Sequence, residues 1–242
     1  CLLWKARVER LPKPLQPMAL LLPKPILYLI TRGATAEATT SASKEFQDIL
    51  GQVSAAVAAG FQLIQLREKK LTARVLFELT ARAAEITRGS STRLLVNDRA
   101  DVASGAGADG VHLTTRSLEA KIVRKTFGDD FLIGASTHSL AEATAARDDG
   151  ADFVVLGPIF PTPSKEEYGP PLGVDRLADV AVALAPFPVL ALGGISTENS
   201  RECLRAGASG IAGISLFRAP ENLSSMCEEI GKLSQIHSGV VK

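Results

Sequence analysis

The chain has 242 residues, and its hydrophobic content of 46% is ample for a sizeable core in one large α/β domain or two small ones. Its 27 Lys and Arg residues nearly balance its 26 Asp and Glu residues, which excludes a global electrostatic reason for binding nucleic acid or a membrane surface. Three cysteines, Cys1, Cys203 and Cys227, are too few and too scattered for a disulfide framework or a zinc cluster, so a reducing, cytoplasmic location is expected.

We predict that residues 1–25 form an N-terminal extension that is disordered or not native before Met18. The stretch CLLWKARVERLPKPLQP is broken by prolines and has neither a clean apolar core nor a small-residue cleavage site, so it does not read as a signal peptide. The apolar run in MALLLPKP that follows is far shorter than the roughly 20 residues that span a bilayer. No membrane partner is therefore expected.

Eight short apolar segments follow one another from residue 26 onward and predict β-strands. They lie at 26–31, 61–67, 93–97, 110–113, 131–136, 153–157, 188–194 and 210–215. Segments with the spacing of amphipathic helices lie between them, for example at 44–59, 71–88, 140–149 and 197–206. Strands that are apolar almost throughout and alternate with helices are typical of a parallel sheet covered on both faces.

The junctions that lead from a helix into the next strand resemble one another. AAGFQLIQL, GAGADGVHL, DDGADFVVLG and RAGASGIAGIS each end a helix with Gly, which supplies a left-handed cap, and then enter a strand. One junction repeated around eight strands favours a closed barrel over an open sheet, and no GxGxxG follows the first strand. We predict an α/β fold, a single (β/α)8 TIM barrel over residues 26–235, with a C-terminal tail at 236–242.

Polar residues concentrate at the predicted carboxyl ends of the strands, where barrels carry their chemistry. Arg67 and Lys69 follow the second strand, and the Gly- and Pro-rich loop GPIFPTPSKEEYGPPLG after the sixth carries Lys165. Cations together with backbone N–H groups, here from LGG and GIS after the last two strands, suit a phosphate or diphosphate. A site for two anions is one interpretation, and a solvated charge run in REKK is the other.

Asp98 in VNDRAD and the two strand-end histidines each have two interpretations. Asp98 could cap a helix, or it could hold Mg²⁺ beside a diphosphate. We expect His112 to be a core residue that supports the site, whereas His138, beyond the end of the fifth strand, is undecided between a supporting and a functional role.

The ordered motifs QLREK, VNDRAD, GADGVHL, IGASTHS, GPIFPTPSK, LALGGI and AGASGIAGIS resemble those of the thiamin phosphate synthase family over about residues 26–217. The thiazole tautomerases share that superfamily. The resemblance implies that hydroxymethylpyrimidine diphosphate is joined to a thiazole phosphate carboxylate, which gives thiamin phosphate and diphosphate. The expected partners are therefore small-molecule substrates, and the sequence leaves open whether the protein forms a homo-oligomer.

The resemblance also implies roles for individual residues. Those that match pyrimidine diphosphate contacts are Gln65, Arg67, Lys69 and Asn97, with Lys165 on the diphosphate and Ser136 at the reacting pyrimidine. Asp98 matches a Mg²⁺ ligand. Those that match the thiazole phosphate pocket are Thr162, Ser164, Gly194, Ile214 and Ser215.

One stretch departs from the synthase pattern. After the fourth strand the family reads roughly His-Leu-Gly-Gln-x-Asp, with the Asp as second Mg²⁺ ligand, whereas this chain reads HLTTRSL and places Ser117 there. Some tautomerases also have Arg-Ser at this point and use a His that matches His138 for proton transfer. A synthase is the first hypothesis, and a tautomerase or a non-catalytic binder of thiamin precursors is the alternative.

Overall fold

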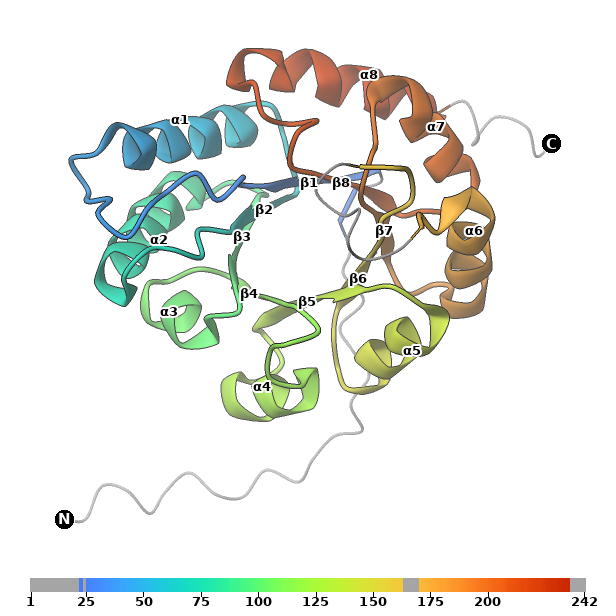
Figure 1. Ribbon diagram of the computed structural model, residues 1–242, viewed down its shortest axis with the longest axis horizontal. Coiled ribbons are helices and arrows are strands. Elements are labelled where there is room, and N and C mark those ends of the chain that lie inside the picture. Colours follow the sequence, from blue (N-terminus) through green and yellow to red (C-terminus); the bar gives the residue numbers. More distant parts are fainter. Residues whose placement is uncertain (1–21, 24, 163–169, 236–242) are drawn as a thin grey trace.

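The computed structural model describes residues 22–23, 25–162 and 170–235. Eight parallel strands close into a barrel in chain order, with helices around the outside, which confirms the predicted (β/α)8 fold (Figure 1). The strands are β1 (Ile26–Ile30), β2 (Leu63–Leu66), β3 (Arg93–Asn97), β4 (Gly110–Leu113), β5 (Leu132–Thr137), β6 (Phe153–Leu156), β7 (Val189–Ala191) and β8 (Gly210–Gly213).

The helices alternate with the strands as expected. They are α1 (Lys44–Ala58), α2 (Ala73–Thr87), α3 (Ala100–Gly105), α4 (Ala120–Phe127), α5 (Leu140–Asp148), α6 (Gly173–Leu184), α7 (Thr197–Arg205) and α8 (Leu223–Gln235), with a short 3₁₀ turn at Pro220–Asn222. Among the residues described, no helix is long and apolar enough to cross a membrane.

Some predicted strands are too long. The second begins at Leu63 instead of Phe61, because the Phe61 amide donates to the Ala56 carbonyl and completes the end of α1. The seventh ends at Ala191, and Gly193 at φ +99° turns the chain out of the sheet shortly after it.

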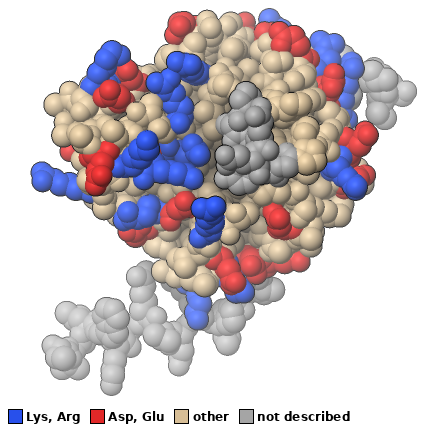
Figure 2. Space-filling view, in the orientation of Figure 1, with Lys and Arg blue, Asp and Glu red and all other residues tan. Residues whose placement is uncertain are grey.

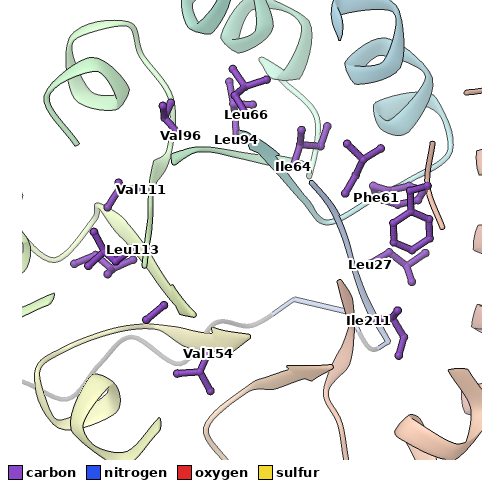
Figure 3. Packing of buried hydrophobic residues seen from close by; sticks show 14 of the residues in the cluster. Leu27, Phe61, Ile64, Leu66, Leu94, Val96, Val111, Leu113, Val154 and Ile211 are labelled. Atoms are coloured by element: carbon purple, nitrogen blue, oxygen red, sulfur yellow. The ribbon is translucent and has the colours of Figure 1, made fainter. Parts of the chain in front are cut away.

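Apolar side chains form two layers, one inside the barrel and one between the barrel and its helices. Tyr28, Leu63 and Phe153 belong to the inner cluster. The outer cluster includes Leu27 and Ile64, which Figure 3 shows pointing away from the barrel interior towards the helices. This alternation along each strand aims every second residue at the interior, so polar residues placed there near the strand ends converge.

The glycines of the repeated junctions have the left-handed conformation predicted from the sequence. Gly107 and Gly207, for example, have φ values of +79° and +93°. A side chain is strained in this conformation, which explains why the same residue recurs before successive strands.

Cys203 and Cys227 are packing residues of the outer cluster. Cys203 is fully buried in α7, and burial raises the pKa of its thiol to about 12. A thiol with so high a pKa is almost entirely protonated at neutral pH and is therefore a poor nucleophile.

Candidate functional site

Two adjoining pockets open at the carboxyl ends of the strands. The first, called here the cationic pocket, contains about 1030 Å³ of empty space that is partly open to solvent. It is lined by Ile30, Gln65, Arg67, Lys69, Asn97, His112, Thr114, Thr115, Arg116, Ser136, His138, Leu192 and Ile214.

The second pocket, called here the glycine pocket, contains about 650 Å³ of empty space. Its lining includes Gly157, Gly193, Gly194, Gly213 and the segment Ile214–Leu216. Ser136, His138, Leu192 and Ile214 line both pockets. Two molecules bound in the two pockets would therefore meet at this shared wall.

The cationic pocket carries three positive side chains, Arg67, Lys69 and Arg116. Figure 2 shows Lys and Arg side chains gathered over the ends of β2 and β3 on the face towards the viewer. None of the three forms an ion pair with a carboxylate in the part of the chain that the structure describes. These charges are therefore available to an anionic ligand.

Glu68 shows that REKK is not simply a solvated charge run. It is only 3% exposed, unlike a residue of a solvated face. Its carboxylate accepts hydrogen bonds from the Gly33 amide at 3.2 Å and from the hydroxyl and amide of Thr35 at 2.7 and 3.3 Å. Glu68 thus ties the loop after β1 to the end of β2 and fixes the backbone that carries Arg67 and Lys69.

Asp98 does not cap α3, because the N-cap residue is Arg99, so that interpretation was wrong. Asp98 has φ +59° and is the one non-glycine residue with positive φ among those described. Its backbone amide donates to the His112 carbonyl at 3.0 Å, which holds this turn between the ends of β3 and β4. Such a conformation is uncommon in a side-chain-bearing residue and is often found at functional sites.

Three side chains donate to the carboxylate of Asp98. Asn97 Nδ2 donates to Oδ2 at 2.6 Å, and the hydroxyls of Thr114 and Ser117 donate to Oδ1. The described residues contain no group of three or more His, Cys, Asp or Glu side chains that could hold a metal. One exposed carboxylate with a hydroxyl beside it fits a Mg²⁺ ion that takes most of its ligands from a bound diphosphate and water.

His112 is a buried residue that supports the site, as expected. Its Nε2 lies 2.9 Å from Ser136 Oγ, and its Nδ1 lies 3.1 Å from the Tyr28 hydroxyl. Burial lowers the pKa of His112 to about 4, with smaller opposing effects from Asp98, which raises the pKa, and Arg67, which lowers it. The imidazole is therefore neutral at physiological pH.

His138 lies just beyond β5 and has a fixed orientation. Its Nδ1 is hydrogen bonded to the Gly157 carbonyl, and its backbone amide donates to Glu142 Oε2 at 2.8 Å. Because a carbonyl oxygen can only accept, Nδ1 carries the proton, and in the neutral ring Nε2 is left as an acceptor.

The glycine pocket presents backbone N–H groups. Those of Gly194, Ile195, Ser215 and Leu216 donate to no acceptor within the described ranges. A Cβ on Gly194 would lie 2.5 Å from the Pro161 carbonyl oxygen, so only glycine allows this close approach of two loops. Free amides in such a turn are typical of phosphate sites.

The helix that follows β7 begins beside this pocket. Ser196 and Asn199 form the N-terminal cap of α7 as a reciprocal capping box, and Asn199 Nδ2 also donates to the Gly194 carbonyl at 3.0 Å. The cap therefore holds the glycine turn and places the positive end of the helix dipole close to it.

The structure gathers the described candidate residues at one end of the barrel. Gln65, Arg67, Lys69, Asn97, Ser136, His138 and Ile214 line the cationic pocket, and Thr162, Gly194 and Ser215 line the glycine pocket. Asp98 lies at the edge, bonded to Asn97 and Thr114. Ser164 and Lys165 lie outside the described residues.

Arg116 and Tyr28 are two polar residues at the site to which the sequence pattern assigned no role. Arg116, the residue before Ser117 in HLTTRSL, lines the cationic pocket. Tyr28 is fully buried inside the barrel and is hydrogen bonded to Gln65 and His112. The available signal for Tyr28 was a hydroxyl at an inward-facing position of an otherwise apolar strand.

Comparisons with known proteins agree with this geometry. A profile of the family described as thiamine monophosphate synthase matches residues 28–217. The chain is 47% identical over 173 residues to a putative thiamine-phosphate synthase from Geobacter sulfurreducens, which covers 72% of this chain and 81% of that protein. It is 39% identical over 197 residues to a thiamine-phosphate synthase from Roseiflexus sp. (strain RS-1), with 81% and 80% covered.

A solved structure is also similar. Thiamine phosphate pyrophosphorylase from Pyrococcus furiosus superposes with a TM-score of 0.73 at 31% identity. The superposition covers 88% of this chain and 97% of that one. The similarity therefore extends over most of this chain and nearly all of that one.

Proposed function

The chain belongs to the thiamine monophosphate synthase family, and we propose that it is the transferase that joins hydroxymethylpyrimidine diphosphate to a thiazole phosphate carboxylate. The products are thiamin phosphate and diphosphate, and the carboxylate leaves as carbon dioxide while a proton takes its place. A cytoplasmic location is part of the proposal.

The observation that carries this proposal is the pair of adjoining pockets. One presents cations and the other presents backbone amides, and both are lined by Ser136, His138, Leu192 and Ile214. A condensation of two phosphorylated molecules needs two anion sites with a common wall, whereas an isomerase of one phosphorylated molecule needs one.

The pyrimidine diphosphate is assigned to the cationic pocket. Arg67 and Lys69 neutralise the phosphates. The side-chain amides of Gln65 and Asn97, which line the same pocket, contact the rest of this substrate. Negative charge accumulates on the diphosphate as its bond to carbon breaks, so cations that are already in place stabilise the transition state more than the ground state. Lys165 is proposed to add a further cation from the loop after β6.

Asp98 is the residue that would hold Mg²⁺ at this pocket. The ion, when bound, supplies additional charge neutralisation to the diphosphate. Ser117 donates to Asp98 and provides no second carboxylate, so diphosphate oxygens and water are proposed to supply most of the ligands.

The thiazole phosphate is assigned to the glycine pocket. The residues proposed to hold it are Thr162, Ser164, Gly194, Ile214 and Ser215. The amides of Gly194 and Ser215 would bind the phosphate oxygens, and the N-terminus of α7 favours the negative charge.

The reaction itself needs no nucleophilic side chain. The bond between the pyrimidine methylene carbon and the diphosphate oxygen breaks, and the electron pair leaves with the diphosphate. The thiazole nitrogen then forms the new bond to that carbon. The contribution of the protein is to hold the two centres in line across the shared wall beside Ser136 and to exclude water from them.

A tautomerase acting on the thiazole phosphate carboxylate is the second candidate, and one observation favours it. His138 lines the glycine pocket, and the bond of its Nδ1 to the Gly157 carbonyl orients the ring so that a neutral imidazole would offer Nε2 as a proton acceptor there. The synthase proposal accounts for more of the site, because the cationic pocket would have no use in a tautomerase.

Incubation of the purified full chain with both precursors, with and without Mg²⁺, tests these functions. Formation of thiamin phosphate together with diphosphate supports the synthase. Isomerisation of the thiazole phosphate carboxylate, with no thiamin phosphate at any Mg²⁺ concentration, supports the tautomerase. Binding of precursors without either conversion would leave only the non-catalytic binder.

A further inference from the structure

A continuous chain of side-chain hydrogen bonds crosses the base of the cationic pocket. It uses one inward-facing residue from each of β1 to β5 together with Asp98. Starting from Asp98 Oδ2, it runs through Asn97 at 2.6 Å, Gln65 at 2.9 Å, Tyr28 at 3.2 Å, His112 at 3.1 Å and Ser136 at 2.9 Å. All the intervening residues are buried, at most 7% exposed, so water does not compete for these bonds.

The direction of the first bonds follows from the chemistry of the carboxylate. An ionised carboxylate only accepts, so the Asn97 nitrogen must face Asp98 and the Asn97 oxygen must face Gln65. The Gln65 nitrogen then donates to that oxygen, which leaves Gln65 Oε1 towards Tyr28. The hydroxyls of Thr114 and Ser117 also lie within hydrogen-bond reach of Asp98 Oδ1, and each can donate its proton to it.

The same reasoning gives the direction of the remaining hydrogen bonds, up to Ser136. Gln65 Oε1 needs a donor, and the Tyr28 hydroxyl has a single proton to give. Tyr28 can therefore only accept from His112, so Nδ1 of that ring must carry the proton. Nε2 of the neutral ring is then an acceptor, and the Ser136 hydroxyl must donate to it. The opposite tautomer would leave a buried carbonyl oxygen of Gln65 without a donor, which is costly.

We propose that Asp98, besides its role towards the diphosphate, fixes the Nδ1-protonated tautomer of His112 through Asn97, Gln65 and Tyr28 and thereby makes Ser136 a hydrogen-bond acceptor towards the substrate. Tyr28 and His112 are positioning residues that act through Ser136. Ser136 lines both pockets, and its free lone pairs can accept a hydrogen bond from an N–H or O–H group of a bound substrate. Under the proposed function that donor is the exocyclic amine of the aminopyrimidine, and this last step alone depends on that function.

The space for the His112 ring is part of the same arrangement. A Cβ on Gly134, the residue paired with His112 in the neighbouring strand, would lie 2.8 Å from His112 Nδ1. The ring therefore fits only beside a glycine, and it has little freedom to turn and exchange its two nitrogens.

Nitrogen-15 NMR of the histidine rings in the full-length protein tests the tautomer. The chain has three histidines, and the His112→Gln variant identifies the signals of His112. At neutral pH we expect His112 to be neutral, with a protonated Nδ1 and an unprotonated Nε2. A protonated Nε2, alone or together with Nδ1, overturns the proposal, whether or not the protein has any synthase activity.

Tyr28→Phe removes only the hydroxyl that links Gln65 to His112. We expect the Nε2-protonated form of His112 to become populated and kcat/KM to fall by roughly threefold to tenfold, the effect of one hydrogen bond. The control is Ile26→Val, which removes a buried methylene from the same strand and should change neither the nitrogen signals nor the rate. If His112 in Tyr28→Phe is still protonated only at Nδ1, then Tyr28 does not fix the tautomer of His112. If this variant fails to fold, the spectrum of the parent protein still decides the tautomer.

Ser136→Ala tests the substrate step separately. We expect it to weaken the binding of a 4-aminopyrimidine alcohol more than that of the same pyrimidine without the amino group, as measured by calorimetry. An equal loss for both ligands overturns the assignment of Ser136 to the amine. Binding of neither ligand to the parent protein counts against the proposed function, while the NMR result still decides the tautomer.

Discussion

The hydroxyl of Ser117 donates a hydrogen bond to the carboxylate of Asp98, although the two residues lie 19 positions apart and on successive loops. By the resemblance of the motifs, Ser117 is proposed to occupy the place at which the synthase pattern has a second acidic residue. A neutral donor in this position orients Asp98 and leaves the edge of the cationic pocket with one negative charge fewer than a second carboxylate would give it.

Ser117→Asp should tighten Mg²⁺ binding, because it gives the ion a second carboxylate. We expect the Mg²⁺ concentration for half-maximal rate to fall by about tenfold, roughly 1.4 kcal/mol. Without Mg²⁺ the two adjacent carboxylates repel, so the melting temperature should fall and then recover when Mg²⁺ is added. Ser117→Asn is the neutral control. If neither the Mg²⁺ dependence nor the rate changes in Ser117→Asp, then residue 117 does not face the metal.

Arg116→Gln should weaken the binding of inorganic diphosphate measured by calorimetry without Mg²⁺, by roughly tenfold for the loss of one charge-assisted contact. Arg88→Gln is the matched control, because Arg88 is exposed at the far end of α2 and lines neither pocket. Equal affinities for diphosphate in the two variants would show that Arg116 does not contact the ligand.

Arg67→Lys should reduce kcat/KM although the charge is kept. A guanidinium can contact a phosphate with two parallel hydrogen bonds, whereas an ammonium is a point charge on a more flexible stem. The backbone of Arg67 is held by Thr31 Oγ1 at 2.8 Å, so the replacement should not disturb the strand end. Unchanged KM and kcat in this variant would favour the solvated-face interpretation of Arg67.

His138→Ala separates the two candidate enzymes. In a synthase His138 contributes position or a single hydrogen bond, so the rate of thiamin phosphate formation should fall by no more than about tenfold. In a tautomerase it would carry the proton, and its loss should cost about 10²–10⁴-fold in isomerisation of the thiazole phosphate. We expect the smaller effect. A collapse of isomerisation, with no synthase activity in the parent, would replace the proposed function by the alternative.

His112 should make the protein less stable as the pH falls. The unfolded chain binds a proton at this residue near the ordinary pKa of 6.5, but burial lowers the pKa of the folded residue to about 4. The unfolded state therefore binds more protons between these values, so stability is lost as the pH falls from about 6.5 to about 4, by about 3 kcal/mol. Urea unfolding across this range should show a shallower pH dependence for His112→Gln. An identical slope in both proteins would mean that His112 titrates normally when folded.

The sequence alone determined the barrel and the end at which its chemistry lies. The apolar strands, the repeated glycine junctions and the polar residues at the strand ends are local patterns, and each follows from the preferences of neighbouring residues. Gln65, Asn97 and Ser136 could be placed at one rim because parallel strands must all end on the same side.

Only the tertiary structure decided which of these residues touch and how. Tyr28 and His112 are 84 positions apart, and their hydrogen bond exists because closure of the barrel brings inward-facing residues of β1 and β4 together. Glu68 was indistinguishable in sequence from its charged neighbours, yet the loop after β1 buries it. Such contacts depend on the packing of the whole barrel, because closure fixes the positions of side chains that are remote in sequence, and no short stretch of sequence specifies that geometry.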